Sequence, residues 1–113
     1  KELVGHFHKG KSFLAFDGEE LIGHLLYTQV DFEFELISIT VKESHRRKQV
    51  GTDLLKSLVS KAKNYRDGVI FLEVAEKNVS AFNLYGKMGF VEISRREKYY
   101  KNGDTALVME LKS

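Results

Sequence analysis

The spacing of apolar residues changes twice along this chain, and these changes limit the folds that it can adopt. Residues 12–16 and 21–27 form strand-like runs on either side of Asp17-Gly18, a pair that favours a tight hairpin turn. Over residues 50–62 the apolar side chains recur at helical spacing instead. The chain then returns to a near-continuous apolar strand at residues 69–75, of the kind buried inside a sheet.

Further apolar runs continue this pattern toward the C-terminus. A second helix is predicted at about residues 79–87, with Asn78 placed to cap its start and Gly89 to end it. Residues 90–94 and 106–111 are predicted to form a closing pair of strands. The element order β-β-β-α-β-α-β-β mixes hairpins with one strand–helix–strand crossover, which places the chain in the α+β (mixed α/β) class.

One predicted strand carries a break in its alternation. Its apolar residues are Phe32, Phe34 and Leu36, and then Ile37, Ile39 and Val41. Because side chains alternate between the two faces of a sheet, both sets can share one face only if a residue is inserted, which predicts a β-bulge at Leu36-Ile37. A strand buried on both faces would show a similar pattern. Bulges often lie beside active sites, so this break is a clue to where a site could be.

A basic segment joins this strand to the first helix. It contains Arg46, Arg47 and Lys48 and continues to Gly51-Thr52. Backbone N–H groups in such a loop converge at the positive end of the helix dipole, where they can bind an anion. Taken alone, such a cluster is more typical of a solvated basic turn than of an anion site.

Composition excludes several classes of function. The formal net charge of +2 is too small to indicate nucleic-acid binding by itself. The chain has no cysteine, which excludes disulfides, thiolate metal sites and a cysteine nucleophile. His6 and His8 stand at strand spacing without a third ligand at a recognisable distance, so we expect no metal site. Without a long apolar run, a secretory signal or a linker, residues 1–113 are expected to form one cytoplasmic domain that contacts no membrane.

Two motifs resemble those of the GNAT superfamily of N-acetyltransferases. The basic segment resembles the acetyl-CoA pyrophosphate loop, Q/R-x-x-G-x-G/A, at Arg46 and Gly51. Gln49 stands where that family usually has glycine, and it can offer its own N–H to a phosphate if its φ is negative. Residues 72–90 are similar to the GNAT signature L-E-V-x-x-x-N-x-x-A-x-x-L-Y-x-x-x-G-F at every fixed position.

The C-terminal part resembles one branch of this superfamily. Residues 95–100 and 104–109 are similar to the R-x-x-Y-Y…D-A-x-x-M ending of the RimI branch, the ribosomal-protein alanine N-acetyltransferases, with Thr105 inserted. The resemblance extends over residues 12–111. It implies the GNAT acyl-CoA N-acyltransferase fold, a mixed, mostly antiparallel sheet with a splayed central strand pair and flanking helices. Members usually begin with a strand and one or two helices before the hairpin, and we expect that strand and helix to be absent here.

The resemblance also implies an activity, the transfer of an acetyl group from acetyl-CoA to an amine such as the α-amino group of a ribosomal protein. It assigns Glu73 as the general base, acting through water, and Tyr85 as the acid that protonates the CoA thiolate. A carboxylate in an otherwise apolar strand is suited to accept a proton if its face is buried. The alternative for Glu73 is a carboxylate that faces solvent or pairs with a nearby lysine. Without the resemblance, Tyr85 would be interpreted as a core aromatic on an amphipathic helix.

Contacts with the two substrates are implied as well. Backbone groups of the splayed strand would meet the pantetheine arm as they would meet an added peptide strand, and the basic loop would hold the pyrophosphate. The candidate cosubstrate-binding residues are Ile39, Thr40, Val41, Arg46, Arg47, Lys48, Gln49, Val50, Gly51, Thr52 and Asn78, of which Asn78 is also explained by its N-cap role. The candidate acceptor-binding residues, near the mouth of the splay, are Glu35, Tyr99 and Tyr100.

Two alternatives stay open. The acceptor could be a small-molecule amine or a lysine side chain instead of a protein N-terminus. The domain could also be a non-catalytic acyl-CoA-binding or RNA-binding module that uses its basic residues, with an affinity for RNA that falls steeply with salt. These residues are Arg46, Arg47, Lys48, Arg95, Arg96 and Lys98. Contact with nucleic acid is otherwise expected only through a ribosomal substrate, and nothing in the sequence indicates an oligomeric state.

Overall fold

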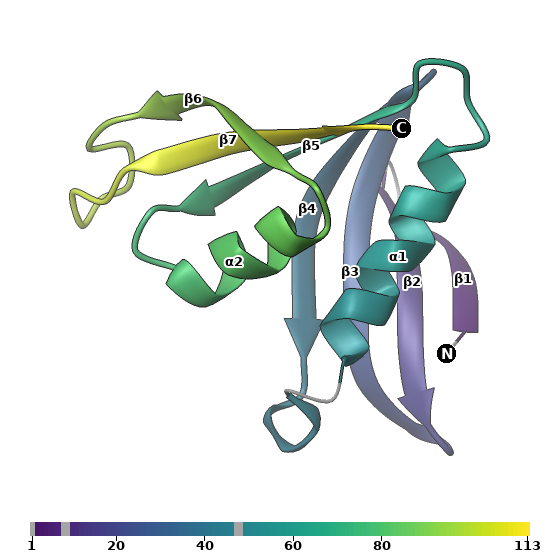
Figure 1. Ribbon diagram of the computed structural model, residues 1–113. Helices are drawn as coiled ribbons and strands as arrows, with labels where there is room; N and C mark the ends of the chain where they lie inside the picture. Colours follow the sequence, from purple (N-terminus) through teal and green to yellow (C-terminus); the bar gives the residue numbers. More distant parts are fainter. Residues whose placement is uncertain (1, 8–9, 47–48) are drawn as a thin grey trace.

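Strands and helices follow one another around a single mixed sheet (Figure 1). In the computed structural model, which describes residues 2–7, 10–46 and 49–113, the strands are β1 (Glu2–Phe7), β2 (Gly10–Asp17), β3 (Glu20–Val30), β4 (Glu33–Val41), β5 (Val69–Ala75), β6 (Val91–Arg96) and β7 (Ala106–Lys112). The helices are α1 (Val50–Ala62), α2 (Val79–Lys87) and a short 3₁₀ helix, η1 (Glu43–His45). The strand order is β1-β2-β3-β4-β5-β7-β6, and only β4 and β5 run parallel.

Both α-helices begin and end where the sequence predicts. The side-chain oxygen of Asn78 accepts a hydrogen bond from the backbone N–H of Ala81 at 3.2 Å, which satisfies one of the free donors in the first turn of α2. Gly89 has a φ of +103°, a conformation that L side chains rarely adopt. Next to it, the N–H of Phe90 donates to the carbonyl of Tyr85 at 3.0 Å. The predicted cap and the predicted glycine stop are therefore both confirmed.

The break in the alternation of β4 is a β-bulge. Leu26 of β3 pairs with Ser38 and Tyr27 pairs with Leu36, so Ile37 is the extra residue. Leu36 belongs to the core, whereas Ile37 is 49% exposed. The bulge is confirmed, but the expectation that Ile37 itself belongs to the apolar set on the core face is wrong.

A strand that the sequence analysis did not expect lies at one edge of the sheet. β1 pairs antiparallel with β2, from Glu2 opposite Leu14 to Phe7 opposite Gly10. The expectation that no strand precedes the hairpin is therefore wrong, although no helix precedes β2 among the residues that the structure describes. A register shift between Val4 and His6 interrupts the alternation of β1, which is why spacing alone did not reveal it.

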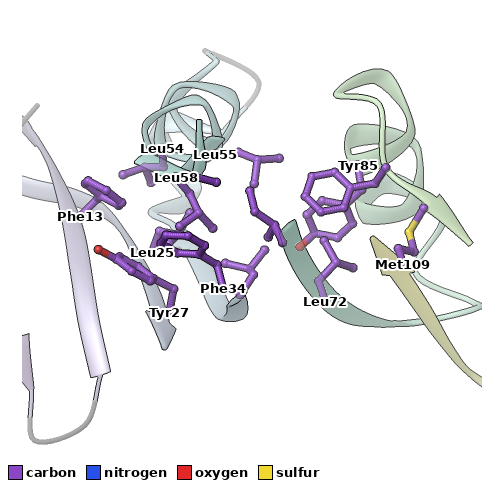
Figure 2. Packing of buried hydrophobic residues seen from close by; sticks show 14 of the residues in the cluster. Phe13, Leu25, Tyr27, Phe34, Leu54, Leu55, Leu58, Leu72, Tyr85 and Met109 are labelled. Carbon is purple, nitrogen blue, oxygen red and sulfur yellow. The ribbon is translucent and has the colours of Figure 1, made fainter. Parts of the chain in front are cut away.

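The hydrophobic core lies between the two α-helices and one face of the sheet (Figure 2). Leu54, Leu55 and Leu58 of α1 are completely buried in the same cluster as Phe34 of β4. Burial of a leucine side chain of this kind contributes about 1.5–3 kcal/mol. Tyr85 of α2 belongs to this cluster too, so both helices are held by one core.

The other face of the sheet is not covered by a helix of the described residues. Both α-helices lie on the same side (Figure 1), and the side chains that alternate with the core residues point away from them. Register pairs place Glu35 beside Phe71, and Glu73 beside Val108, on this opposite side, which we call the open face. No helix in the described part of the chain is long and apolar enough to cross a membrane.

Candidate active site

Strands β4 and β5 pair over only part of their length. Their register covers residues 33–35 of β4 and 69–71 of β5, whereas β5 pairs with β7 from Val69 to Ala75. Beyond these pairs β4 diverges from β5 (Figure 1), so its edge toward β5 has no partner strand among the described residues. This confirms the splayed central pair. A bulge bends a strand and increases its twist, and the bulge at Ile37 lies where the two strands part.

A cleft of about 1060 Å³ lies between the end of β4, the start of α1 and α2. It is lined by nearly all of the candidate cosubstrate-binding residues, namely Ile39, Thr40, Val41, Arg46, Gln49, Val50, Gly51, Thr52 and Asn78, and by the candidate acid Tyr85. Arg47 and Lys48 lie outside the described residues. Residues predicted from three separate segments are thus brought to one cleft.

The N-terminus of α1 opens into this cleft. The first N–H groups of an α-helix have no partner within the helix, and Val50, Gly51 and Thr52 of the first turn line the cleft. Intrahelical bonding begins with the N–H of Asp53, which donates to the carbonyl of Gln49 at 2.9 Å, and no side chain caps this end. The free N–H groups and the positive end of the helix dipole make the first turn a place for an anion.

Gln49 precedes α1 in the left-handed conformation, with φ 64° and ψ 12°. The condition under which it could offer its N–H to a phosphate, a negative φ, is therefore not met. A residue with a side chain in this conformation costs about 1–2 kcal/mol. A glycine would adopt it without that strain, which is the physical reason for glycine at this point of the loop.

Arg46 folds back onto the end of β4. Its Nε donates to the carbonyl oxygen of Val41 at 3.1 Å, so this carbonyl already has a side-chain donor. The guanidinium group is held at the cleft, where it adds positive charge beside the first turn of α1.

The wall that α2 provides was mostly missed by the sequence analysis. Besides Asn78 and Tyr85, this wall contributes Ser80, Ala81, Asn83, Leu84, Lys87 and Met88, and His45 of η1 lines the cleft as well. Residues 80, 84 and 87 share one helical face, and that periodicity could have shown a second wall. Spacing alone does not reveal it, because a helix face toward a cleft and one toward a core have the same periodicity.

Gly51 lies where the three walls approach one another. A Cβ atom at this position would lie 3.7 Å from a methyl carbon of Val41 and 3.9 Å from one of Leu84. These are ordinary van der Waals distances, so alanine fits here. A branched side chain would extend further among these walls.

Tyr85 belongs to both the core and the cleft. It is 6% exposed, and its ring lies 5.8 Å from that of Phe90. It also lines the cleft, and Figure 2 shows it next to Leu72 of β5. Burial raises the pKa of its hydroxyl, so the phenol keeps its proton at neutral pH.

The candidate base Glu73 lies on the open face and is exposed. The condition of a buried face is not met, because the core takes its neighbours Leu72 and Val74. The hydroxyl of Tyr100 donates a hydrogen bond to a carboxylate oxygen of Glu73 at 3.2 Å. Burial, and then the negative charge of Glu73, raise the pKa of Tyr100, so this phenol stays protonated and can donate.

The other candidate acceptor-binding residues share the open face or border it. Glu35 of β4 pairs with Phe71, which lies two residues before Glu73 on β5. Glu35 and Phe71 both line a smaller cavity of about 260 Å³. The ring of Tyr99 packs edge-to-face on that of Tyr100 with 5.3 Å between centroids. Carboxylates and phenols therefore gather on one side of the sheet and the cleft lies on the other, with the unpaired edge of β4 between them.

No arrangement for a metal ion occurs among the described residues, which contain no group of three or more His, Cys, Asp or Glu side chains that could hold one. Of the two histidines noted in the sequence, His8 lies outside the described residues.

Comparisons with known proteins agree with this geometry. The model of the acetyltransferase (GNAT) family matches residues 2–90. An N-alpha-acetyltransferase of Sulfurisphaera tokodaii is 39% identical over 75 residues, 66% of this chain and 45% of that protein. The N-alpha-acetyltransferase RimI of Mycobacterium tuberculosis is 36% identical over 70 residues, 62% of this chain and 42% of that protein. The chain thus spans less than half the length of these curated relatives.

Among solved structures, the ribosomal-protein-S18-alanine N-acetyltransferase of Escherichia coli superposes with a TM-score of 0.85. It is 26% identical, and the match covers 95% of this chain and 71% of that one.

Gly51→Val is expected to abolish binding of CoA while the domain stays folded. The added methyl groups would enter the cleft beside the free N–H groups of the first turn, where the pyrophosphate would have to come closest to the backbone. Gly51→Ala, whose single carbon fits, is the matched control and should retain most of the affinity. Calorimetry measures both, with circular dichroism to establish folding, and undiminished affinity in Gly51→Val would contradict this placement of the pyrophosphate.

Gln49→Gly is expected to raise the free energy of unfolding by about 1 kcal/mol, because it relieves the left-handed strain. Its affinity for CoA should be equal to or better than that of the wild type. Denaturant unfolding and calorimetry test the two parts separately. A large loss of affinity would show that the glutamine side chain is itself a contact.

Proposed function

Because the chain belongs to the acetyltransferase (GNAT) family, we propose that it transfers an acetyl group from acetyl-CoA to the α-amino group of a protein such as a ribosomal protein. The observation that carries this proposal is the cleft, which joins an anion-binding helix terminus to the unpaired edge of β4. A diphosphate attached to a long amide-containing arm matches such a cleft at both ends. The acceptor class follows the names of the relatives, which acetylate α-amino groups.

In this proposal the cosubstrate lies along the cleft from α1 to the open sheet. The N–H groups of residues 50–52 bind the pyrophosphate, with Arg46 as an additional cation. The amide groups of the pantetheine arm pair with those backbone groups of residues 39–41 that neither β3 nor the side chain of Arg46 engages, as an added strand would. The thioester then lies near the bulge at Ile37, where β4 and β5 part and the open face is within reach.

The reaction needs a neutral amine, a polarised carbonyl and a proton for the leaving group. Glu73 accepts the proton of the ammonium group, directly or through water, and the amine nitrogen then attacks the thioester carbon. The carbon–sulfur bond of the tetrahedral intermediate breaks, and the thiolate takes the proton of Tyr85. The nitrogen of the new amide loses its second proton to water, and water returns a proton to the Tyr85 phenolate. The exposed position of Glu73 suits a base that exchanges protons with water, and the raised pKa of Tyr85 keeps its proton available.

The open face supports a cationic acceptor. Glu35 and Glu73 supply negative charge, and Tyr99 and Tyr100 border them with aromatic surface. A protonated amino group is attracted to carboxylates, and the start of a peptide chain can pack on the tyrosines.

Two measurements in sequence test the proposed function. Calorimetry first establishes whether acetyl-CoA binds with a stoichiometry of one. A peptide array with free N-termini, side-chain lysines and acetylated N-termini then identifies the acceptor. Acetylation confined to free α-amino groups is the expected result, whereas labelling of blocked peptides at lysine would contradict the proposed acceptor.

Glu73→Gln and Tyr85→Phe are each expected to lower turnover by a factor of about 10² to 10⁴ while the affinity for acetyl-CoA changes little. For Glu73→Gln the loss should shrink as pH rises, because an amine that is already neutral needs no base. The pKa of Tyr85 lies above the ordinary value of 10.0, so its acid role should not limit the wild-type rate below that pH. Turnover measured against pH, together with binding and thermal unfolding, separates chemistry from packing. If both variants turn over like the wild type, the proposed mechanism is wrong.

A further inference from the structure

Two ion pairs connect the turn between β2 and β3 to residues 42–46, which we call the approach segment because it leads from β4 toward the cleft. Asp17 ends β2 and Glu20 begins β3, and the two lie opposite each other in the hairpin register. Nε2 of His45 lies 3.0 Å from a carboxylate oxygen of Asp17, and the ammonium group of Lys42 contacts the carboxylate of Glu20.

Core packing does not hold the approach segment. η1, which makes up most of it, contains no buried residue. Backbone hydrogen bonds tie its start to the sheet, since the N–H of Lys42 donates to the carbonyl of Ile22 at 2.7 Å. The His45 ring is engaged at both nitrogens, because the Ser44 hydroxyl lies 2.8 Å from Nδ1. Backbone hydrogen bonds also form within the segment, where the N–H of His45 donates to the carbonyl of Lys42 at 2.8 Å. The side-chain contacts that join the segment to the β2–β3 turn are those with Asp17 and Glu20.

The approach segment also forms part of the cleft. His45 and Arg46 both line it, so a shift of this segment would move one wall of the proposed cosubstrate site. The hydrogen bond from Lys42, and then its positive charge, lower the pKa of Glu20, which therefore stays ionised at neutral pH and keeps its partner.

We propose that Asp17 and Glu20 are positioning residues for the cosubstrate, which hold the approach segment so that His45 and Arg46 keep their places at the cleft. The inference rests on the proposed function, because it concerns the binding of CoA. It assigns a role to the β2–β3 turn, whose residues do not themselves line the cleft.

The sign of the effect distinguishes positioning from simple electrostatics. CoA is strongly anionic, so two carboxylates near its phosphates oppose binding through space. If Asp17 and Glu20 acted only through their charge, neutralising them would tighten the binding of CoA. If they position the approach segment, neutralising them weakens it.

The test compares Asp17→Asn, Glu20→Gln and the double variant with Glu19→Gln. Glu19 lies in the same turn and loses the same charge, but it forms no hydrogen bond or ion pair within the described part of the chain. Calorimetry should show CoA affinity roughly two- to fivefold weaker in each single variant, since pairs as exposed as these contribute little individually. The KM for acetyl-CoA should rise in step while kcat stays constant. Glu19→Gln should bind CoA as the wild type does, or slightly more tightly.

Two further readouts link the effect to the approach segment. Hydrogen exchange at the backbone N–H groups of residues 42–46 should be faster in the double variant without any ligand, and unchanged in Glu19→Gln. Asp17→Asn should also have little effect in a His45→Gln background, because Asp17 acts through that ring.

Equal or tighter CoA binding in Asp17→Asn and Glu20→Gln would overturn the inference. The affinity of the wild type is measured first, so a failure of the proposed function is recognised separately. If the unaltered chain does not bind CoA, both the function and this inference fall. If it binds CoA and the variants bind equally well, only the inference falls.

Discussion

The arrangement of the whole site depends on how the backbone hydrogen bonds of β4 are satisfied. β4 pairs with β3 along its length, but it meets β5 at only three register pairs before the two strands part at the bulge. β5 turns its other edge to β7 and is fully paired there. The edge of β4 is thus left open in the middle of a sheet, where an unpaired polar group that is shut off from water costs about 1–3 kcal/mol. A cleft that admits water or an extended ligand removes that cost. The bulge separates the two strands, and the cleft lets the backbone groups that are exposed by this separation form hydrogen bonds.

The single core explains why Glu73 and the candidate acceptor-binding residues lie on one side of the sheet, and Tyr85 and the cleft on the other. α1 and α2 pack on the same face, so every second residue of β5 is taken up by the core and the residues between them face away. Glu73 and Tyr85 come from consecutive elements, yet one is exposed and the other is buried. Through the opening between β4 and β5, Glu73 on the open face and Tyr85 on the cleft side could both approach one bound molecule.

Patterns among neighbouring residues predicted much of this fold. The errors arose where contacts between distant parts of the chain determine the structure. The cap at Asn78, the stop at Gly89 and the bulge at Ile37 depend on neighbouring residues, and all three are present. β1 was not predicted, because a register shift between Val4 and His6 interrupts the alternation of its side chains. The exposure of Glu73 could not be predicted, since an apolar strand does not reveal which face its helices will cover. The left-handed Gln49 depends on the path between a strand and a helix, which composition does not encode.

The short contact between β4 and β5 divides the sheet into two half-sheets, β1–β4 and β5–β7, joined within the sheet at residues 33–35 and 69–71. The cleft lies between the free parts of these halves, with β4 and α1 on one wall and α2 on the other. A molecule bound there would contact both half-sheets and so help to hold them together. Whatever binds the folded state alone stabilises it in proportion to the logarithm of its concentration. The free energy of unfolding of this fold would then rise with the concentration of the molecule that binds in the cleft.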